Sequence, residues 1–452
     1  MSAELAISLC SSTHAPPPMD LSCSQSIKSN LEDEEYENST APAPNIQTLF
    51  RNCNVLGCAY LMCSIVSFCS SSYTGPGSAL DVLSLMSDVM CIDITSALFV
   101  MAGCAAASLF AANSPVKQGQ ITRHVCVAML LDMYCATACS LVLGSLHAVI
   151  MARFKWSDVA FTAVDGITTL RVLDFRQSET AQHSFNLSVW PVQCLFWCVL
   201  STNGLIEMEA WLVQRMPAMA DGCICLMSLL GIVLFTVFGS MQASSNIFYA
   251  NASSVTYRTL EFNLGVHVIF LYKRHVALVA ALRRVSQQAA YVVALLCATV
   301  WFAEIGRSVP PRRDDSCLRL YYRNTCLQDH HGFFLRGCAM ALFALLCTNN
   351  RLPDMLHQEL RLTGVLLSAL CFCWPVCIAV KLVLDATFGT VLINQNRPFV
   401  LVMCATTLFI LSFSYASLIQ PKMLSCAKRV LQRHTTSQAP PPDSLHTPLV
   451  SD

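Results

Sequence analysis

The stretch LLSALCFCWPVCIAVKLVL, residues 366–384, is apolar almost throughout. A helix needs roughly 20 mostly apolar residues to cross the hydrocarbon core of a bilayer, so the stretch is long enough to span a membrane. It also contains a Trp-Pro pair and a lysine, which are costly in hydrocarbon unless neighbouring helices or a polar cavity receive them. We therefore expect a membrane helix that faces other protein segments as well as lipid.

The whole chain has the composition of a membrane protein. Of its 452 residues, 54% are hydrophobic and only 12% are charged, whereas charged residues make up about a quarter of an ordinary soluble protein. About ten apolar segments recur along the chain, and the sequence therefore predicts an all-α, polytopic bundle of about ten transmembrane helices. The expected spans are 54–73, 91–112, 124–151, 188–206, 221–241, 259–273, 287–304, 332–348, 362–385 and 398–419.

Polar tails flank this membrane domain. Residues 1–48 are rich in Ser, Pro and acidic side chains, and residues 424–452 end in a Pro-rich run, so both are predicted to be disordered around a domain at 49–423. An even number of spans places both tails on one side. Lys and Arg are more frequent in segments on that side, which makes it the cytoplasmic one. No run of like charge points to nucleic acid, and the expected partner is the lipid bilayer.

The opposite side of the membrane would carry the processing sites. Asn186 and Asn251 lie in Asn-x-Ser sequons and are candidate glycosylation sites there. Cys317 and Cys326 lie in a polar loop on the same side, where a disulfide can form. The other cysteines are scattered through apolar segments as small hydrophobic residues, and no paired CxxC motif predicts a metal site.

Charged residues within apolar segments require an explanation because insertion of each costs about 2.5–3.5 kcal/mol. Asp132 and Arg336 lie several residues inside their segments, so each is expected to face a polar interior. Two interpretations are open. These residues either form ion pairs between helices or line a cavity for a substrate.

Five stretches in order carry a family resemblance. They are LFRNCNVLGCAYLM (49–62), ALFVMAGCA (97–105), TYRTLEFNLGV (256–266), TGVLLSALCFCWPV (363–376) and SYASLIQPKM (414–423). Together they resemble integral-membrane acyltransferase family three, whose members modify bacterial surface polysaccharides and nodulation factors. The resemblance implies transfer of an acyl group from acyl-CoA, as co-substrate, to a hydroxyl of a carbohydrate or lipid acceptor, with no bound cofactor. The candidate substrate-binding residues are Arg51, Arg123, Arg258, Glu261, Arg336 and Trp374.

The sequence departs from the family pattern where the chemistry is expected. The first-helix histidine that acts as general base in the family falls on Met62, and the histidine of the His-Trp-Pro motif falls on Cys373. A methionine cannot accept a proton, so His124 and Asp132 are the candidate catalytic bases that the third segment offers. Two alternatives remain open: an inactive relative that acts as a receptor or scaffold, and a membrane transporter.

Overall fold

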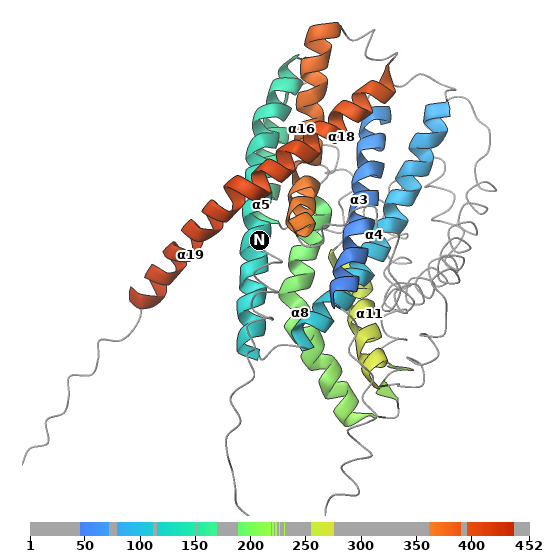
Figure 1. Cartoon of the computed structure of the whole chain (residues 1–452), viewed down its shortest axis with the longest axis vertical. Helices are drawn as coiled ribbons and strands as arrows, with labels where there is room; N and C mark the ends of the chain where they lie inside the picture. The colour runs from blue at the N-terminus through green and yellow to red at the C-terminus, as the bar shows by residue number, and fades with distance from the viewer. Residues whose placement is uncertain are drawn as a thin grey trace, which may run out of the picture.

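The computed structural model describes residues 46–71, 79–111, 115–150, 152, 154–169, 189–217, isolated positions up to 230, 255–274, 361–389 and 396–437. The described segments are helical, and none of them forms a β-strand. The helices assemble into an elongated bundle (Figure 1). They are α3 (Ile46–Ser71), α4 (Ala79–Ala111), α5 (Pro115–Ile150), α6 (Trp156–Thr168), α8 (Trp190–Arg215), α11 (Val255–Arg274), α16 (Arg361–Phe388), α18 (Arg397–Ser414), the π-helical turn η3 (Tyr415–Ile419) and α19 (Gln420–Ser437).

The all-helical class is confirmed, but about ten membrane spans are not. Within the described residues, four helical stretches are long and apolar enough to cross a membrane, and the shorter apolar stretch Ile94–Phe110 lies in α4. The four stretches are Thr48–Val66, Gln118–Ile150, Gly364–Phe388 and Pro398–Ala427. Two predicted spans, 287–304 and 332–348, lie outside the described residues, and 221–241 lies almost wholly outside them. The apolar helices are compatible with association with a lipid bilayer.

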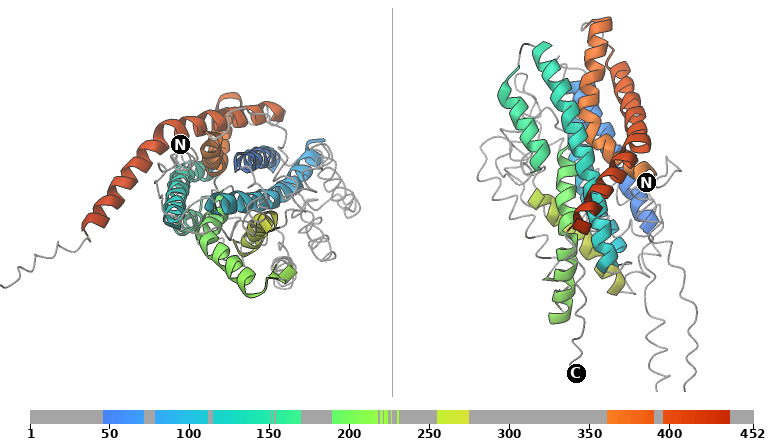
Figure 2. Two further views of the ribbon diagram at one scale, coloured as in Figure 1. Left: turned by 60° about the horizontal axis from the view of Figure 1, so that its bottom comes forward. Right: turned by 90° about the vertical axis from the view of Figure 1, so that its left-hand side faces the viewer.

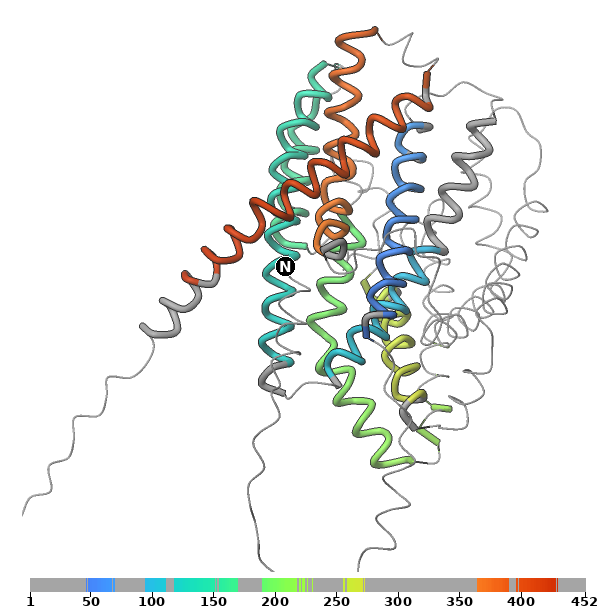
Figure 3. The backbone as a smooth tube through the Cα atoms, in the orientation of Figure 1, coloured from blue at the N-terminus to red at the C-terminus, as the bar shows by residue number. Residues whose placement is uncertain are grey.

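Two hydrophobic cores hold the described helices together. The first is formed by α3, α5, α8, α16 and α18, and the second by the start of α3 with α4, α8 and α11. Helices α3 and α4 lie side by side over much of their length (Figure 3). Because α3 and α8 contribute to both cores, they join the two halves of the bundle.

Helices α4 and α11 touch through their backbones. A Cβ atom added at Gly103 would clash with the carbonyl oxygen of Phe262, and one added at Gly265 would clash with the carbonyl oxygen of Val100. The thiol of Cys104 donates to the Gly265 carbonyl oxygen at 3.2 Å. Small residues at such crossings let membrane helices approach closely. Gly103 and Gly265 therefore have a packing role.

Helix α16 runs without a break through Pro375. The preceding Trp374 packs edge-on against Phe68 of α3, with ring centroids 4.8 Å apart, and the next turn is buried in the first core. A proline removes one backbone hydrogen bond from a helix, and tight packing by neighbouring helices compensates for that loss. The apolar stretch at residues 366–384 is therefore part of one continuous helix at the centre of the bundle.

Two helical features differ from the sequence prediction. Helix α6, which was not expected, packs against α5, and Gly166 lies directly on Thr137. Residues 424–437, predicted to belong to a disordered tail, are the main part of helix α19. They contain no Pro or Gly and place Leu424, Ala427 and Leu431 at helical spacing, so a helix is favourable there. Figures 1 and 2 show α19 leaving the side of the bundle.

Large apolar side chains are exposed along α5, α16 and α18. They are Val142, Leu146, Val149, Ile150, Val383, Phe388, Phe399, Val402, Phe409, Ile410 and Phe413. Exposed apolar surface of this kind is costly in water but favourable against lipid. We refer to these eleven residues as the apolar belt.

Candidate functional site

A buried carboxylate lies where α5, α16 and the start of α19 meet. Asp132 of α5 is only 1% exposed. The side-chain amide of Gln420 donates to its two oxygens at 2.9 and 3.1 Å, and the Ser368 hydroxyl of α16 lies 3.1 Å from Oδ2. The same hydroxyl is 3.0 Å from the Gly364 carbonyl oxygen, so its single hydrogen can be donated to either acceptor. We call Asp132, Ser368 and Gln420 the Asp132 centre.

The π-helical turn η3 leads directly into this centre. A π-helical turn is wider than an α-helical one and changes the rotational position of the residues that follow it. The first residue of η3, Tyr415, is buried and packs edge-on against Phe372 of α16, with ring centroids 5.0 Å apart. Gln420, the residue immediately after η3, is 4% exposed and points toward α5. The local winding of the helix therefore positions the amide that binds Asp132.

The partners of Asp132 are neutral. Asp132 forms no ion pair with any described residue, and its hydrogen bonds come from an amide and a hydroxyl. Interhelical polar contacts of this type connect membrane helices at specific positions. In this geometry the carboxylate connects three segments that are far apart in the sequence.

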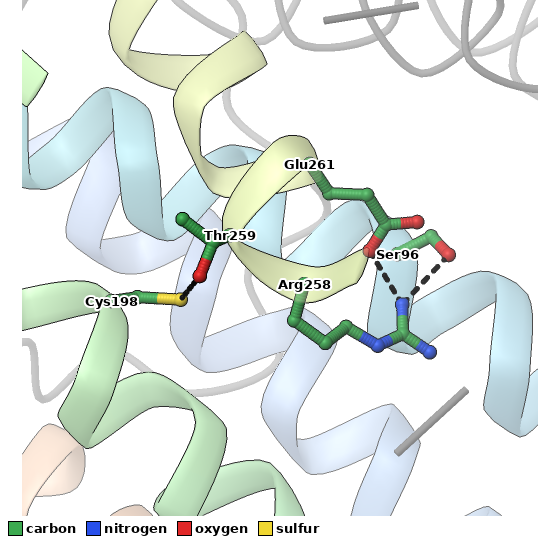
Figure 4. A network of polar contacts seen from close by, with 5 residues as sticks. All are labelled: Ser96, Cys198, Arg258, Thr259 and Glu261. Atoms are coloured by element: carbon green, nitrogen blue, oxygen red, sulfur yellow. Dashed lines mark hydrogen bonds and ion pairs between the residues drawn. The ribbon is translucent and has the colours of Figure 1, made fainter. Parts of the chain in front are cut away.

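A second polar centre lies between α4 and α11. Arg258 is fully buried, and its Nη1 lies 2.5 Å from Glu261 Oε2 and 3.0 Å from Ser96 Oγ (Figure 4). The guanidinium also lies 5.4 Å from the ring centroid of Phe99 and 5.5 Å from that of Trp190. Paired charge, hydrogen bonding and aromatic faces together compensate for the removal of the arginine from water.

Helices α8 and α11 share two further polar contacts. His267 Nδ1 lies 3.2 Å from Glu209 Oε1, and both side chains are buried. The residue next to Arg258 on α11 is Thr259, whose hydroxyl is 3.6 Å from the Cys198 sulfur (Figure 4). The polar side chains of α11 therefore contact its neighbours on both sides.

The structure separates the two candidate bases. His124 and Asp132 both lie on α5, eight positions apart, which is about 12 Å along the axis at about 1.5 Å per residue. Arg123 is exposed, Arg51 and Trp374 are partly buried, and Met62 is 47% exposed. Arg336, the Cys317 and Cys326 pair, and the sequons at Asn186 and Asn251 lie outside the described residues.

Sequence reasoning did not identify the partners of Asp132. Gln420 and Ser368 were each one polar residue within the quoted stretches 414–423 and 363–376. Ser96, Glu209 and His267 were likewise not connected to a site. The available signal was a polar side chain inside an apolar segment, which shows that a partner is needed but not which one.

No protein-family model, characterised protein or solved structure matches this chain. Among the described residues, no three or more His, Cys, Asp or Glu side chains gather closely enough to hold a metal ion. The class of protein that the fold defines is an all-helical one with apolar, membrane-compatible helices. Its function has to be inferred from the two polar centres.

Proposed function

We propose that this chain is a multi-pass membrane protein of the receptor or scaffold type, in which the buried polar centres connect helices and carry out no acyl transfer. One observation carries the proposal: the carboxylate of Asp132 is enclosed by Ser368 and Gln420 and is 1% exposed. The resemblance to membrane acyltransferases then concerns the arrangement of helices and not their chemistry.

The environment of Asp132 argues against a catalytic role. A general base has to reach the acceptor hydroxyl at about 2.6–3.2 Å, or through one water. Both oxygens of Asp132 already accept hydrogen bonds from protein donors. His124 lies eight positions before Asp132 on α5, which is about two helical turns. Neither residue therefore completes a base-and-orienter pair with the other.

The candidate substrate-binding residues Arg258 and Glu261 also support this proposal. A residue that binds CoA phosphates has to present its guanidinium to the ligand. Arg258 is 0% exposed and shares its Nη1 between Glu261 and Ser96. Its contacts are those of a structural residue that joins α4 to α11.

The membrane topology is part of the same proposal. The four apolar stretches would cross the bilayer with the apolar belt toward lipid. Both termini would then be cytoplasmic, and the larger part of α19, which follows the last apolar stretch, would lie at that surface. The bilayer is the partner on which this arrangement depends.

A measurement of acyl-CoA turnover distinguishes this proposal from the alternative function, an acyltransferase with a carbohydrate or lipid acceptor. Purified protein in lipid nanodiscs is incubated with labelled acetyl-CoA or longer acyl-CoA, and bound CoA and thioester loss are measured. We expect neither to exceed that of empty nanodiscs. Turnover that falls at least tenfold in Asp132→Asn or His124→Ala, but not in the matched variant Met62→Ala, would establish the enzyme instead.

A further inference from the structure

Helix α19 carries positive charge and no negative charge. Between Gln420 and Ser437 the sequence contains Lys422, Lys428, Arg429 and Arg433, and no Asp or Glu. Runs of cations beside an apolar membrane segment are attracted to anionic lipid headgroups. Lys422 lies within the last two turns of the apolar stretch Pro398–Ala427, and Lys428, Arg429 and Arg433 follow it.

The start of α19 is fixed to the bundle. Gln420 binds Asp132, and the Met423 sulfur lies 3.9 Å from the Cys135 sulfur, so the first turn is joined to α5. Beyond this turn α19, which we call the arm, extends sideways from the bundle, as the left view in Figure 2 shows. The arm therefore has a defined origin and direction and does not continue along the bundle axis.

The arm is amphipathic from its first turns. Lys422 and Arg429 are exposed, whereas Leu424 is 8% exposed. Lys422, Arg429 and Arg433 follow each other at spacings of seven and four residues, which places them on one side of an α-helix. The apolar positions Leu424, Ala427 and Leu431 recur at spacings of three and four. A basic side opposite an apolar side is typical of helices that lie in the membrane interface.

The apolar belt leads directly to the start of the arm. Phe409, Ile410 and Phe413 of α18 are exposed, and so are Leu418 and Ile419 of η3. Exposed apolar residues up to position 419 place the lipid-facing surface next to Gln420. Lys422 lies within the last two turns of the apolar stretch Pro398–Ala427, and the other three cations of α19 follow that stretch.

We propose that α19 lies on the membrane surface and binds the headgroups of anionic lipids through Lys422, Arg429 and Arg433. Leu424 packs against the bundle, the apolar positions beyond it rest on the acyl-chain boundary, and the cations meet the phosphate and carboxylate groups. Lipid is the occupant because the charge of the arm complements an anionic leaflet and the arm is continuous with the apolar belt. This contact does not depend on whether the bundle is catalytic.

Hydrogen exchange of the full chain in nanodiscs tests the proposal. Exchange over residues 424–437 is compared between discs of phosphatidylcholine alone and discs containing about one third phosphatidylserine. We expect the backbone amides of this segment to exchange at least threefold more slowly in the anionic discs. High salt should remove most of the difference because it screens the charges.

The triple variant Lys422→Gln, Arg429→Gln, Arg433→Gln should exchange at the same rate in both kinds of disc. Arg215→Gln, which removes an exposed cation from the end of α8, is the matched control and should keep the wild-type difference. Unchanged exchange of α5 in the triple variant would show that the bundle remains folded. Equal exchange rates of the wild-type arm in the two kinds of disc would overturn the proposal. This holds both for fast exchange and for slow exchange that results from protection by the protein itself. A difference that persists in the triple variant would also overturn it.

Discussion

Gln420 donates hydrogen bonds of 2.9 and 3.1 Å to the two carboxylate oxygens of Asp132, although 288 positions separate these residues in the sequence. The contact joins the start of α19 to the middle of α5, and Ser368 adds α16 to the same carboxylate. A residue that the sequence offers as a catalytic base is thus the meeting point of three helical segments.

The glycine contact between α4 and α11 gives the first prediction. Gly103→Ala or Gly265→Ala should lower stability by about 1–3 kcal/mol because the new methyl group has to displace the facing backbone. Unfolding by SDS in mixed micelles measures the change. Gly204→Ala on α8 is the control, since a Cβ there meets open space, and alanine should stabilise that helix slightly. Equal effects at all three positions would contradict the close crossing.

The Arg258 centre predicts strong non-additivity. Arg258→Met should cost about 3–5 kcal/mol because it leaves Glu261 buried without its partner. The double variant Arg258→Met, Glu261→Leu should recover much of that loss, since no charge then remains buried. The same unfolding measurement applies, with the exposed Arg215→Gln as a variant of little effect. Additive losses in the double variant would show that the two side chains act independently.

The proposed topology predicts that both ends of the chain lie on the same side of the membrane. Epitope tags at the two termini should show the same sensitivity to protease in sealed vesicles of known orientation. Detergent, which opens the vesicles, is the control that makes every tag accessible. Protection of one tag and digestion of the other would rule out an even number of crossings.

The helical class and the approximate positions of several helices follow from the sequence because long apolar runs are strong signals. Seven of the expected spans overlap described helices, from α3 at 54–71 to α18 at 398–414. The extension of α19 and the existence of α6 were not predicted. Both are amphipathic or short, and their apolar residues are too few to stand out against loop or tail composition.

The candidate site could be predicted only in part. Asp132 was recognised because a charge in an apolar helix is costly, and its burial confirms that it faces the protein interior. Its partners Ser368 and Gln420 could not be assigned, since pairing across 236 and 288 positions depends on helix rotation. The π-helical turn at 415–419 sets that rotation for Gln420, and no residue pattern in the sequence indicated it.

The most direct test of the central claim is a double-mutant cycle between Asp132 and Gln420. Unfolding free energies are measured for the wild type, Asp132→Asn, Gln420→Ala and the double variant, and their combination isolates the interaction between the two side chains. If the Asp132 centre connects α5 to α19, the coupling free energy should be about 0.5–3 kcal/mol and stabilising. Single-variant effects that simply add would mean that the carboxylate and the amide do not hold these helices together.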